Sequence, residues 1–220
     1  MVFAPSSFGA FIPINTNNAA DVALFQAGAT VVTFESLTGQ NTLTDGTSIA
    51  AASQLDNQLK ASDGVFFTSG GVTPVAVLDL TGIGTARSGK NVIAPIEINT
   101  DLLCASGTSC FLEIFFTGAH SKVGGWFDNG DVQMIIFWTD ATSNIVLAPK
   151  GNFAGGEDTA KTIDHVTLLF SASGSGGPRT MDDLTFGGAA AAIPEPSTVV
   201  PIVGALAALG FFRRRRRRRD

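Results

Sequence analysis

Short stretches in which apolar and polar residues alternate fill most of the chain between residues 30 and 186. They are rich in Val, Ile, Phe and Thr, which favour extended strands, and Gly, Pro, Asn, Asp or Ser residues separate them. The pattern predicts strands at residues 30–35, 65–68, 75–80, 92–98, 111–117, 123–127, 132–139, 144–147, 163–171 and 181–186. About ten short strands joined by turns predict an all-β fold, a two-sheet sandwich of jelly-roll type.

Helical patterning is weaker and lies mainly near the two ends of the chain. Asn17 and Asn18 precede a run of helix-forming residues that ends at Gly28, which predicts one short helix with an Asn at its N-cap. Residues 36–63 are polar and rich in Thr, Asp, Gly and Gln, with a short helix or strand expected near residues 49–59. Residues 199–212 form an uncharged apolar run, which predicts a helix at the C-terminal end.

The C-terminal tail joins three pieces with different physical properties. The Pro194, Glu195 and Pro196 motif excludes helix, and the apolar run that follows can satisfy its own backbone hydrogen bonds in a bilayer. A cluster of arginines then stops transfer and stays on the cytoplasmic side. The cluster consists of Arg213, Arg214, Arg215, Arg216, Arg217, Arg218 and Arg219.

The apolar run predicts a single membrane helix that holds the chain only weakly. At about 1.5 Å per residue it spans roughly 21 Å, against about 30 Å of hydrocarbon core. A buried core helix and a nucleic-acid-binding arm are the alternatives. The arginines next to the apolar run argue against the first, and the apolar run fused to the arginines argues against the second.

The order of these pieces resembles the PEP-CTERM sorting signal, a tail also named the ice-binding protein C-terminal domain. The resemblance implies that an exosortase-type membrane protease processes the tail near Pro194, Glu195 and Pro196. It also implies an exported protein of the cell envelope or the extracellular space, held briefly in the inner membrane with its C-terminus in the cytoplasm. The resemblance covers the tail alone, so it implies where the protein is sorted and not what activity it has.

The chain is expected to divide into four parts. Residues 1–28 form an N-terminal segment with the short helix, 29–188 the β-sandwich, 189–193 a linker, and 194–220 the sorting signal. The first residues show neither the basic region nor the apolar run of a secretory leader. We therefore expect residues 1–12 to be the stub of a longer leader, or the true start to lie upstream.

The charge of the chain is divided unequally between the tail and the rest. The whole chain has 14 basic and 19 acidic residues; without the tail's seven arginines and two carboxylates, residues 1–193 keep 7 and 17, a balance of −10. An acidic body does not favour nucleic acid or anionic lipid as partners and can attract divalent cations.

Two cysteines, Cys104 and Cys110, are the whole cysteine content. In an oxidising compartment they are expected to close a short disulfide loop. Two buried free thiols are the alternative. The spacing fits neither a metal site nor a Cys-x-x-Cys redox motif.

Several segments of the body also resemble, more distantly, jelly-roll domains that precede such tails and carbohydrate-binding and lectin sandwiches. These are VTFE at residues 32–35, VGGWFDNGDVQMIIFWTD at 123–140 and TMDDLTFG at 180–187. The resemblance implies that the first and last strands are neighbours. It further implies that Glu35, together with Asp182 or Asp183, holds a structural Ca²⁺.

Other candidate chemistry has simpler structural explanations. Asn129-Gly130 between two strands predicts a tight hairpin, with calcium binding by its flanking carboxylates as the alternative. Residues 82–89 lack a phosphate-loop pattern and predict a surface loop. His165 is expected on a strand surface, and neither His165 nor His120 lies near a nucleophile motif.

The aromatic residues are expected to supply most of the core. Trp126 and Trp138 are assigned there, with a sugar-stacking platform as the alternative. The same assignment is made for Phe111, Phe115, Phe116, Phe127, Phe137 and Phe170.

These observations favour an exported, non-enzymatic surface or extracellular-matrix protein that binds exopolysaccharide or populates the envelope. A calcium-dependent, lectin-like carbohydrate-binding module is the first alternative. A secreted hydrolase is the second.

Overall fold

The computed structural model describes residues 10–44, 46–84, 86–104, 110–128, 131–170 and 179–188. The chain divides into two compact units, Met1–Ala190 and Ala191–Asp220, and the described residues all belong to the first. The sorting signal expected at residues 194–220 and the linker at 189–193 lie outside the described residues. Asn129 and Gly130 lie outside them as well, but the strands on either side, Lys122–Phe127 and Val132–Trp138, belong to different sheets, so the predicted hairpin is wrong. Within the described part of the chain, no helix is long and apolar enough to cross a membrane.

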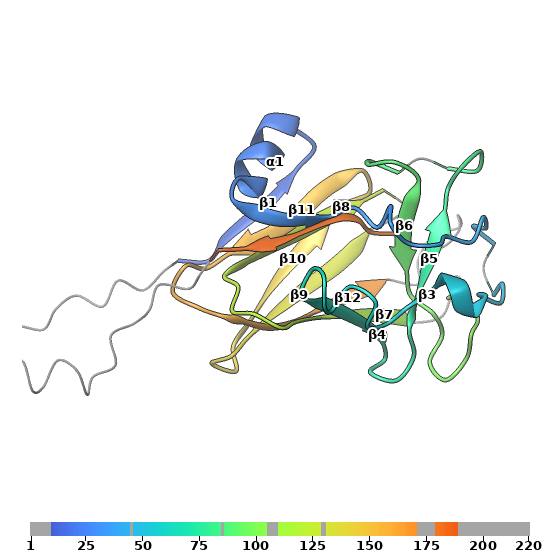
Figure 1. Ribbon diagram of the computed structural model, residues 1–220. Helices are drawn as coiled ribbons and strands as arrows, with labels where there is room; N and C mark the ends of the chain where they lie inside the picture. The colour runs from blue at the N-terminus through green and yellow to red at the C-terminus, as the bar shows by residue number, and fades with distance from the viewer. Residues whose placement is uncertain are drawn as a thin grey trace, which may run out of the picture. The chain divides into compact units, whose positions relative to one another are not determined.

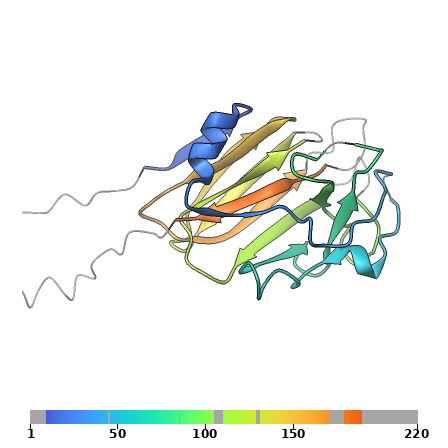
Figure 2. The ribbon, with the colours of Figure 1, turned by 45° about the horizontal axis from the view of Figure 1, so that its top comes forward.

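The fold is mostly β-sheet, as predicted, and two five-stranded antiparallel sheets lie in a sandwich-like arrangement (Figures 1 and 2). The β8 sheet contains, in spatial order, β1 (Ile12–Thr16), β11 (Asn152–Glu157), β8 (Lys122–Phe127), β13 (Asp182–Gly187) and β2 (Ala29–Val32). The β9 sheet contains β10 (Ser143–Ala148), β9 (Val132–Trp138), β12 (Ile163–Phe170), β7 (Cys110–Phe116) and β4 (Val65–Ser69).

The core between the two sheets follows from strict alternation along the strands. In β9, Val132, Met134, Ile136 and Trp138 are buried, whereas the residues between them are only half-buried. Successive side chains of a strand point to opposite faces of its sheet, so one face of β9 lines the core and the other faces outward.

A third, smaller sheet of β3 (Gln54–Leu55), β5 (Val75–Asp79) and β6 (Asn91–Ala94) lies at one end of the sandwich (Figure 1). The expected element near residues 49–59 is a 3₁₀ turn, η1 (Ala51–Ser53), followed by the two-residue β3. A second apolar cluster packs around this sheet and includes Ile49, Leu78, Val92, Ile96 and Leu103.

The predicted N-terminal helix is present as α1 (Ala19–Gln26), on the β8 sheet. The side chain of Asn18 accepts a hydrogen bond from the backbone N–H of Ala20 at 2.9 Å, as an N-cap does. At the other end, Lys122 Nζ donates to the carbonyls of Phe25 at 2.8 Å and Ala27 at 3.0 Å. A cation there satisfies carbonyls that a helix C-terminus leaves without partners.

Two strands were not predicted from the sequence. β1 pairs with β11, so the sandwich includes residues before the expected boundary at residue 29. β11 contains Gly155 and Gly156 in succession, and a Cβ at Gly155 would overlap the backbone of Val123. The close approach of two strands explains why a glycine-rich segment is extended here.

The aromatic residues divide between the core that separates the two sheets and the outward sides of both sheets. Trp138 and Phe127 are buried in the inter-sheet core, as predicted, and Trp126 is buried beneath α1 on the other side of the β8 sheet. The assignment of Phe111, Phe115 and Phe137 to the core is wrong. They occupy the alternate positions of β7 and β9 that point away from it.

Candidate functional site

The expected calcium ligands meet at one loop, although they are far apart in the sequence. Residues 86–91, which we call the 86–91 loop, lead into β6. Glu35 Oε1 accepts hydrogen bonds from the backbone N–H groups of Lys90 at 3.0 Å and Asn91 at 2.7 Å. Asp182 Oδ2 accepts from the N–H groups of Arg87 at 2.7 Å and Ser88 at 3.0 Å. The two carboxylates therefore fasten the loop at both of its ends.

Asp183 completes this arrangement from the strand that carries Asp182. Its carboxylate accepts a short hydrogen bond from the Ser88 hydroxyl, and its backbone N–H donates to Asp182 Oδ1 at 2.7 Å. Pairing of β13 with β2 brings Asp183 to the end of the chain segment that carries Glu35. This neighbouring position of the first predicted strand and the last was expected from the resemblance.

The backbone takes up unusual conformations at these carboxylates. Phe34, just before Glu35, has φ of 62°, and Asp183 has φ of 48°, both in the left-handed region that non-glycine residues rarely adopt. Gly89 has φ of 58°, and a Cβ at this position would overlap the Glu35 carboxylate. Strain of this kind persists only where the surrounding contacts hold it.

Burial disfavours the charged form of the carboxylates on β13. Burial raises the pKa of Asp182 to about 6, and the charge of Asp183 adds to the shift, while N–H groups of the 86–91 loop oppose it. Burial also raises the pKa of Asp183, helped by the charges of Asp128 and Glu35. The site therefore brings several carboxylates together, and keeping Asp182 and Asp183 charged there costs the fold stability.

Arg87 brings a positive charge to the carboxylates of this site. Its Nε lies 2.9 Å from Asp128 Oδ1, its Nη2 donates to the carbonyl of Gly151 at 2.9 Å, and its guanidinium carbon lies 4.2 Å above the Trp126 ring. The other oxygen of Asp128, Oδ2, is buried and has no hydrogen-bond partner among the described residues. Trp126 thus supports an arginine rather than offering an open ring to a sugar.

The side chains, as arranged, do not fit a calcium ion. Ca²⁺ takes six to eight oxygen ligands at about 2.3–2.6 Å. Here Glu35 Oε1, both Asp182 oxygens and Asp183 Oδ1 are directed at N–H or O–H donors. No three Asp, Glu, His or Cys side chains of the described residues are grouped so as to hold a metal ion. Calcium stays a prediction.

The predicted disulfide between Cys104 and Cys110 is present. It closes a loop of sequence separation 6 and joins the segment after the small sheet to the start of β7. The alternative of two free thiols is thereby excluded, since the structure has no free cysteine.

The two histidines occupy different environments. The His120 ring packs edge-on against Phe116 and Phe186, and burial lowers its pKa. His165 lies on the outward surface of β12, as predicted, with Nδ1 2.8 Å from Asp164 Oδ2. No hydrogen bond joins either ring to a serine among the residues that the structure describes.

The outward face of the β9 sheet, which we call the outer face, carries a second candidate site that the sequence did not reveal. Paired residues on neighbouring strands point the same way, so the outward side chains form rows across the sheet. The first row is Leu147, Gln133, Leu169 and Phe111; the second is Ile145, Ile135, Thr167, Glu113 and Thr68; the third is Ser143, Phe137, His165, Phe115 and Phe66.

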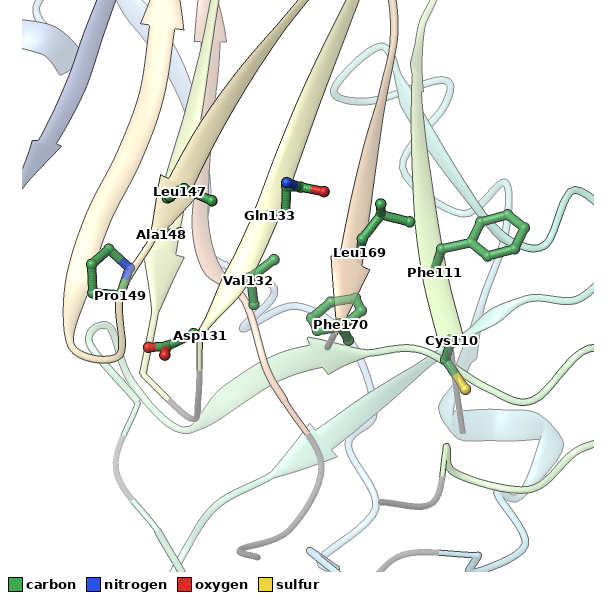
Figure 3. Close-up of a pocket in the computed structure, with 10 residues that line it drawn as sticks. All are labelled: Cys110, Phe111, Asp131, Val132, Gln133, Leu147, Ala148, Pro149, Leu169 and Phe170. Atoms are coloured by element: carbon green, nitrogen blue, oxygen red, sulfur yellow. The ribbon is translucent and has the colours of Figure 1, made fainter. Parts of the chain in front are cut away.

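A cavity of about 590 Å³ lies at one end of the outer face. Figure 3 shows the first row spread over neighbouring strands, with Asp131 and Pro149 at one side and Cys110 at the other. The walls are mainly apolar, and the Gln133 amide and the Asp131 carboxylate are the polar side chains that line it. A concave apolar site with few polar groups is typical of binding surfaces.

Comparison with known proteins gives little. No family model matches the chain, and no curated protein matches it. Among solved structures, the chain is similar to the K2 cleaved adhesin domain of Lys-gingipain, at 15% sequence identity and a TM-score of 0.41, over 72% of this chain and 99% of that chain. A similarity this low carries no conclusion about what the protein does.

Proposed function

We propose that this chain is an exported, non-enzymatic protein of the bacterial surface or extracellular matrix, sorted by its C-terminal tail. The observation that carries the proposal is the order of pieces in the tail: the Pro194, Glu195 and Pro196 motif, the apolar run 199–212 and the arginine cluster 213–219. Each piece has a separate role in a membrane. The apolar run enters it, the arginines stop it, and the motif stays extended at the outer surface.

The disulfide supports export. Disulfides persist in oxidising compartments and are rare where cellular thiols keep cysteines reduced. Cys104 and Cys110 are bonded to each other in the structure.

The strand order supports the finer assignment of a jelly-roll fold. The sheets contain the orders β2-β13-β8-β11 and β7-β12-β9-β10, with β1 and β4 added at the edges. From β7 onward the chain passes repeatedly between the two sheets, as it does in a jelly roll built from two Greek keys. Such a sandwich, followed by a single membrane helix at residues 199–212, suits a domain displayed outside the membrane.

The proposal is tested by the topology of the tail. A reporter fused after Asp220 is expected in the cytoplasm, because the arginines cannot cross the bilayer. Replacing the seven arginines by glutamines is expected to remove the stop and let the tail pass through or misorient. A reporter that lies outside the membrane in the unmodified protein contradicts the proposal.

A calcium-dependent carbohydrate-binding module is the second candidate, and one observation favours it. Asp128 Oδ2 is buried and has no hydrogen-bond partner within the described part of the chain, and the nearby Asp182 and Asp183 have raised pKa values. A bound cation would give Asp128 Oδ2 a partner and favour the charged form of both aspartates. The side chains would first have to turn from their N–H donors. Thermal unfolding in excess calcium and in EDTA decides: equal midpoints exclude this candidate, and a rise of several degrees in calcium supports it.

A further inference from the structure

The outer face is an apolar surface to which all five strands of the β9 sheet contribute. Its rows contain mainly aliphatic and aromatic side chains, and two aliphatic ones lie on the edge strand β10. There Ile145 is 57% exposed and Leu147 is 65% exposed. Contiguous apolar patches of a few hundred Å² on a monomer often mark interaction sites, and an exposed apolar edge strand is a surface that proteins usually protect.

The opposite side of the sandwich is treated differently. There α1, blue in Figure 2, packs on the β8 sheet. Val22 of this helix is buried with Trp126 and Phe153. Among the described residues no helix packs on the outer face. One sheet is thus covered from within the chain, and the other presents large apolar side chains.

Two ionisable groups of the outer face have hydrogen-bond partners within the chain. Glu113 Oε2 accepts a hydrogen bond from Thr68 Oγ1 at 3.0 Å, and His165 is held by Asp164. The Gln133 amide carries both donors and an acceptor, so two such amides from two copies can satisfy each other. Buried polar groups need such partners.

The aromatic row argues against a sugar as the occupant. Ring centroids are 5.1 Å apart for Phe66 and Phe115 and 4.4 Å apart for Phe137 and His165, with interplanar angles of 13° and 12°. These spacings are close to the distance of about 4.8 Å between neighbouring strands, so the rings stand face to face across the sheet. Their edges point outward, whereas a sugar ring stacks on an open face.

We propose that the outer face is a homotypic interface at which two copies of this chain pack sheet against sheet. Flat sheet faces can pack about 10 Å apart with interdigitating side chains, and a two-fold axis lets the same patch serve both copies. The cavity at the end of the first row gives a side chain of the second copy a place to insert.

The size of the face predicts a weak dimer. Five strands about 4.8 Å apart and rows about 6.8 Å apart give roughly 24 by 20 Å, or about 500 Å² per copy. Two copies then bury about 1,000 Å², at the lower limit of specific interfaces. The net charge of −10 on residues 1–193 opposes association through repulsion that salt screens, so the dimer tightens as salt is raised.

The experiment is sedimentation equilibrium of the full chain in mild detergent, density-matched so that the micelle does not contribute, at about 1–100 µM protein. The double variant Ile145→Lys/Leu147→Lys changes the outer face. The matched control is Leu24→Lys, at a residue 76% exposed on α1. All these side chains are more than half exposed, so the variants are expected to fold; near-UV circular dichroism checks this, and Leu147→Gln replaces the double variant if it does not fold.

The unmodified chain is expected to form a reversible dimer that tightens with salt. The double variant is expected to weaken it more than tenfold, and Leu24→Lys to leave it unchanged. A monomer throughout the range overturns the proposal, as does equal association of the unmodified chain and the double variant. Loss of the dimer in Leu24→Lys overturns the assignment to the outer face, because Leu24 lies on α1, outside that face.

Discussion

Replacing Asp182 by Asn removes a carboxylate from the 86–91 loop with almost no change in volume. Asp182 is 1% exposed and accepts from two backbone N–H groups, of Arg87 and Ser88, on one oxygen. On the other it accepts from the Ser88 hydroxyl at 3.3 Å and the Asp183 N–H at 2.7 Å. An amide has one acceptor oxygen, and its NH₂ group would face N–H donors.

The variant is expected to be less stable, and the deficit is expected to grow in acid. Each buried polar group left without a partner costs about 1–3 kcal/mol. At neutral pH the wild type carries an opposing cost, since burial raises the pKa of Asp182 to about 6 from 3.8. We therefore expect a net loss of about 1–3 kcal/mol in the free energy of unfolding at pH 7.5.

The sign of the pH effect follows from the raised pKa. A carboxyl whose pKa is higher in the folded state contributes stability that is fully present below about 3.8 and lost as pH rises through about 6. The wild type therefore gains this stability at pH 4 but not at pH 7.5, whereas the Asn variant gains it at neither pH. The gap, which is the difference in free energy of unfolding between wild type and variant, is expected to be about 2 kcal/mol wider at pH 4 than at pH 7.5.

Urea unfolding at pH 4 and pH 7.5 measures the gap. His120 titrates in both proteins, so its effect cancels. Asp79→Asn is the matched control, because Asp79 pairs with Lys90 of the same loop, and that hydrogen bond lowers its pKa to about 2. Its contribution is present above about 3.8 and lost as pH falls through about 2, so its gap should stay level or narrow in acid. An Asp182→Asn gap that is equal at both pH values refutes the raised pKa.

Other substitutions test the remaining contacts. Changing Cys104 and Cys110 to Ser should lower the free energy of unfolding by about 2–3 kcal/mol, measured in urea, because the disulfide closes a short loop. Lys122→Met should cost about 1–3 kcal/mol and speed amide exchange in α1, since two carbonyls lose their donor. Gly89→Ala should cost more than Gly82→Ala: both have positive φ, but only at Gly89 does a Cβ overlap another residue. Equal losses of unfolding free energy in the two variants would show that overlap with Glu35 is not the cause.

The strands that were predicted from the sequence are those in which local pattern and burial agree. β9 alternates between core and outward residues along its whole length. Asn18 is the N-cap of α1, and the helix-forming residues after it predict the helix. β1 and β11 escaped prediction for a physical reason. Pro13 and the glycines of β11 carry low strand preference, and they are extended because neighbouring strands pair with them or approach them closely.

The sites depend on register and on loop placement, which local patterns do not contain. The stack of His165 between Phe115 and Phe137 requires the pairing of β12 with both neighbours. The alternation along β7 and β9 separates core phenylalanines from outward ones. The prediction assigned them all to the core because they are aromatic, without using this alternation. The resemblance implied that Glu35 and Asp182 or Asp183 hold a calcium ion. It did not indicate the 86–91 loop, whose N–H groups donate to the Glu35 and Asp182 carboxylates instead.

The most direct test of the proposed sorting is the intact mass of the protein recovered from cells that carry an exosortase-type protease. The account predicts a product shortened near Pro194, lacking the apolar run and the arginines. It also predicts that Pro194→Ala together with Pro196→Ala leaves the chain at full mass, because helix can then extend through the motif from the alanines before it. Full-mass protein from the unmodified chain, or equal release of a shortened body from both versions, contradicts the account.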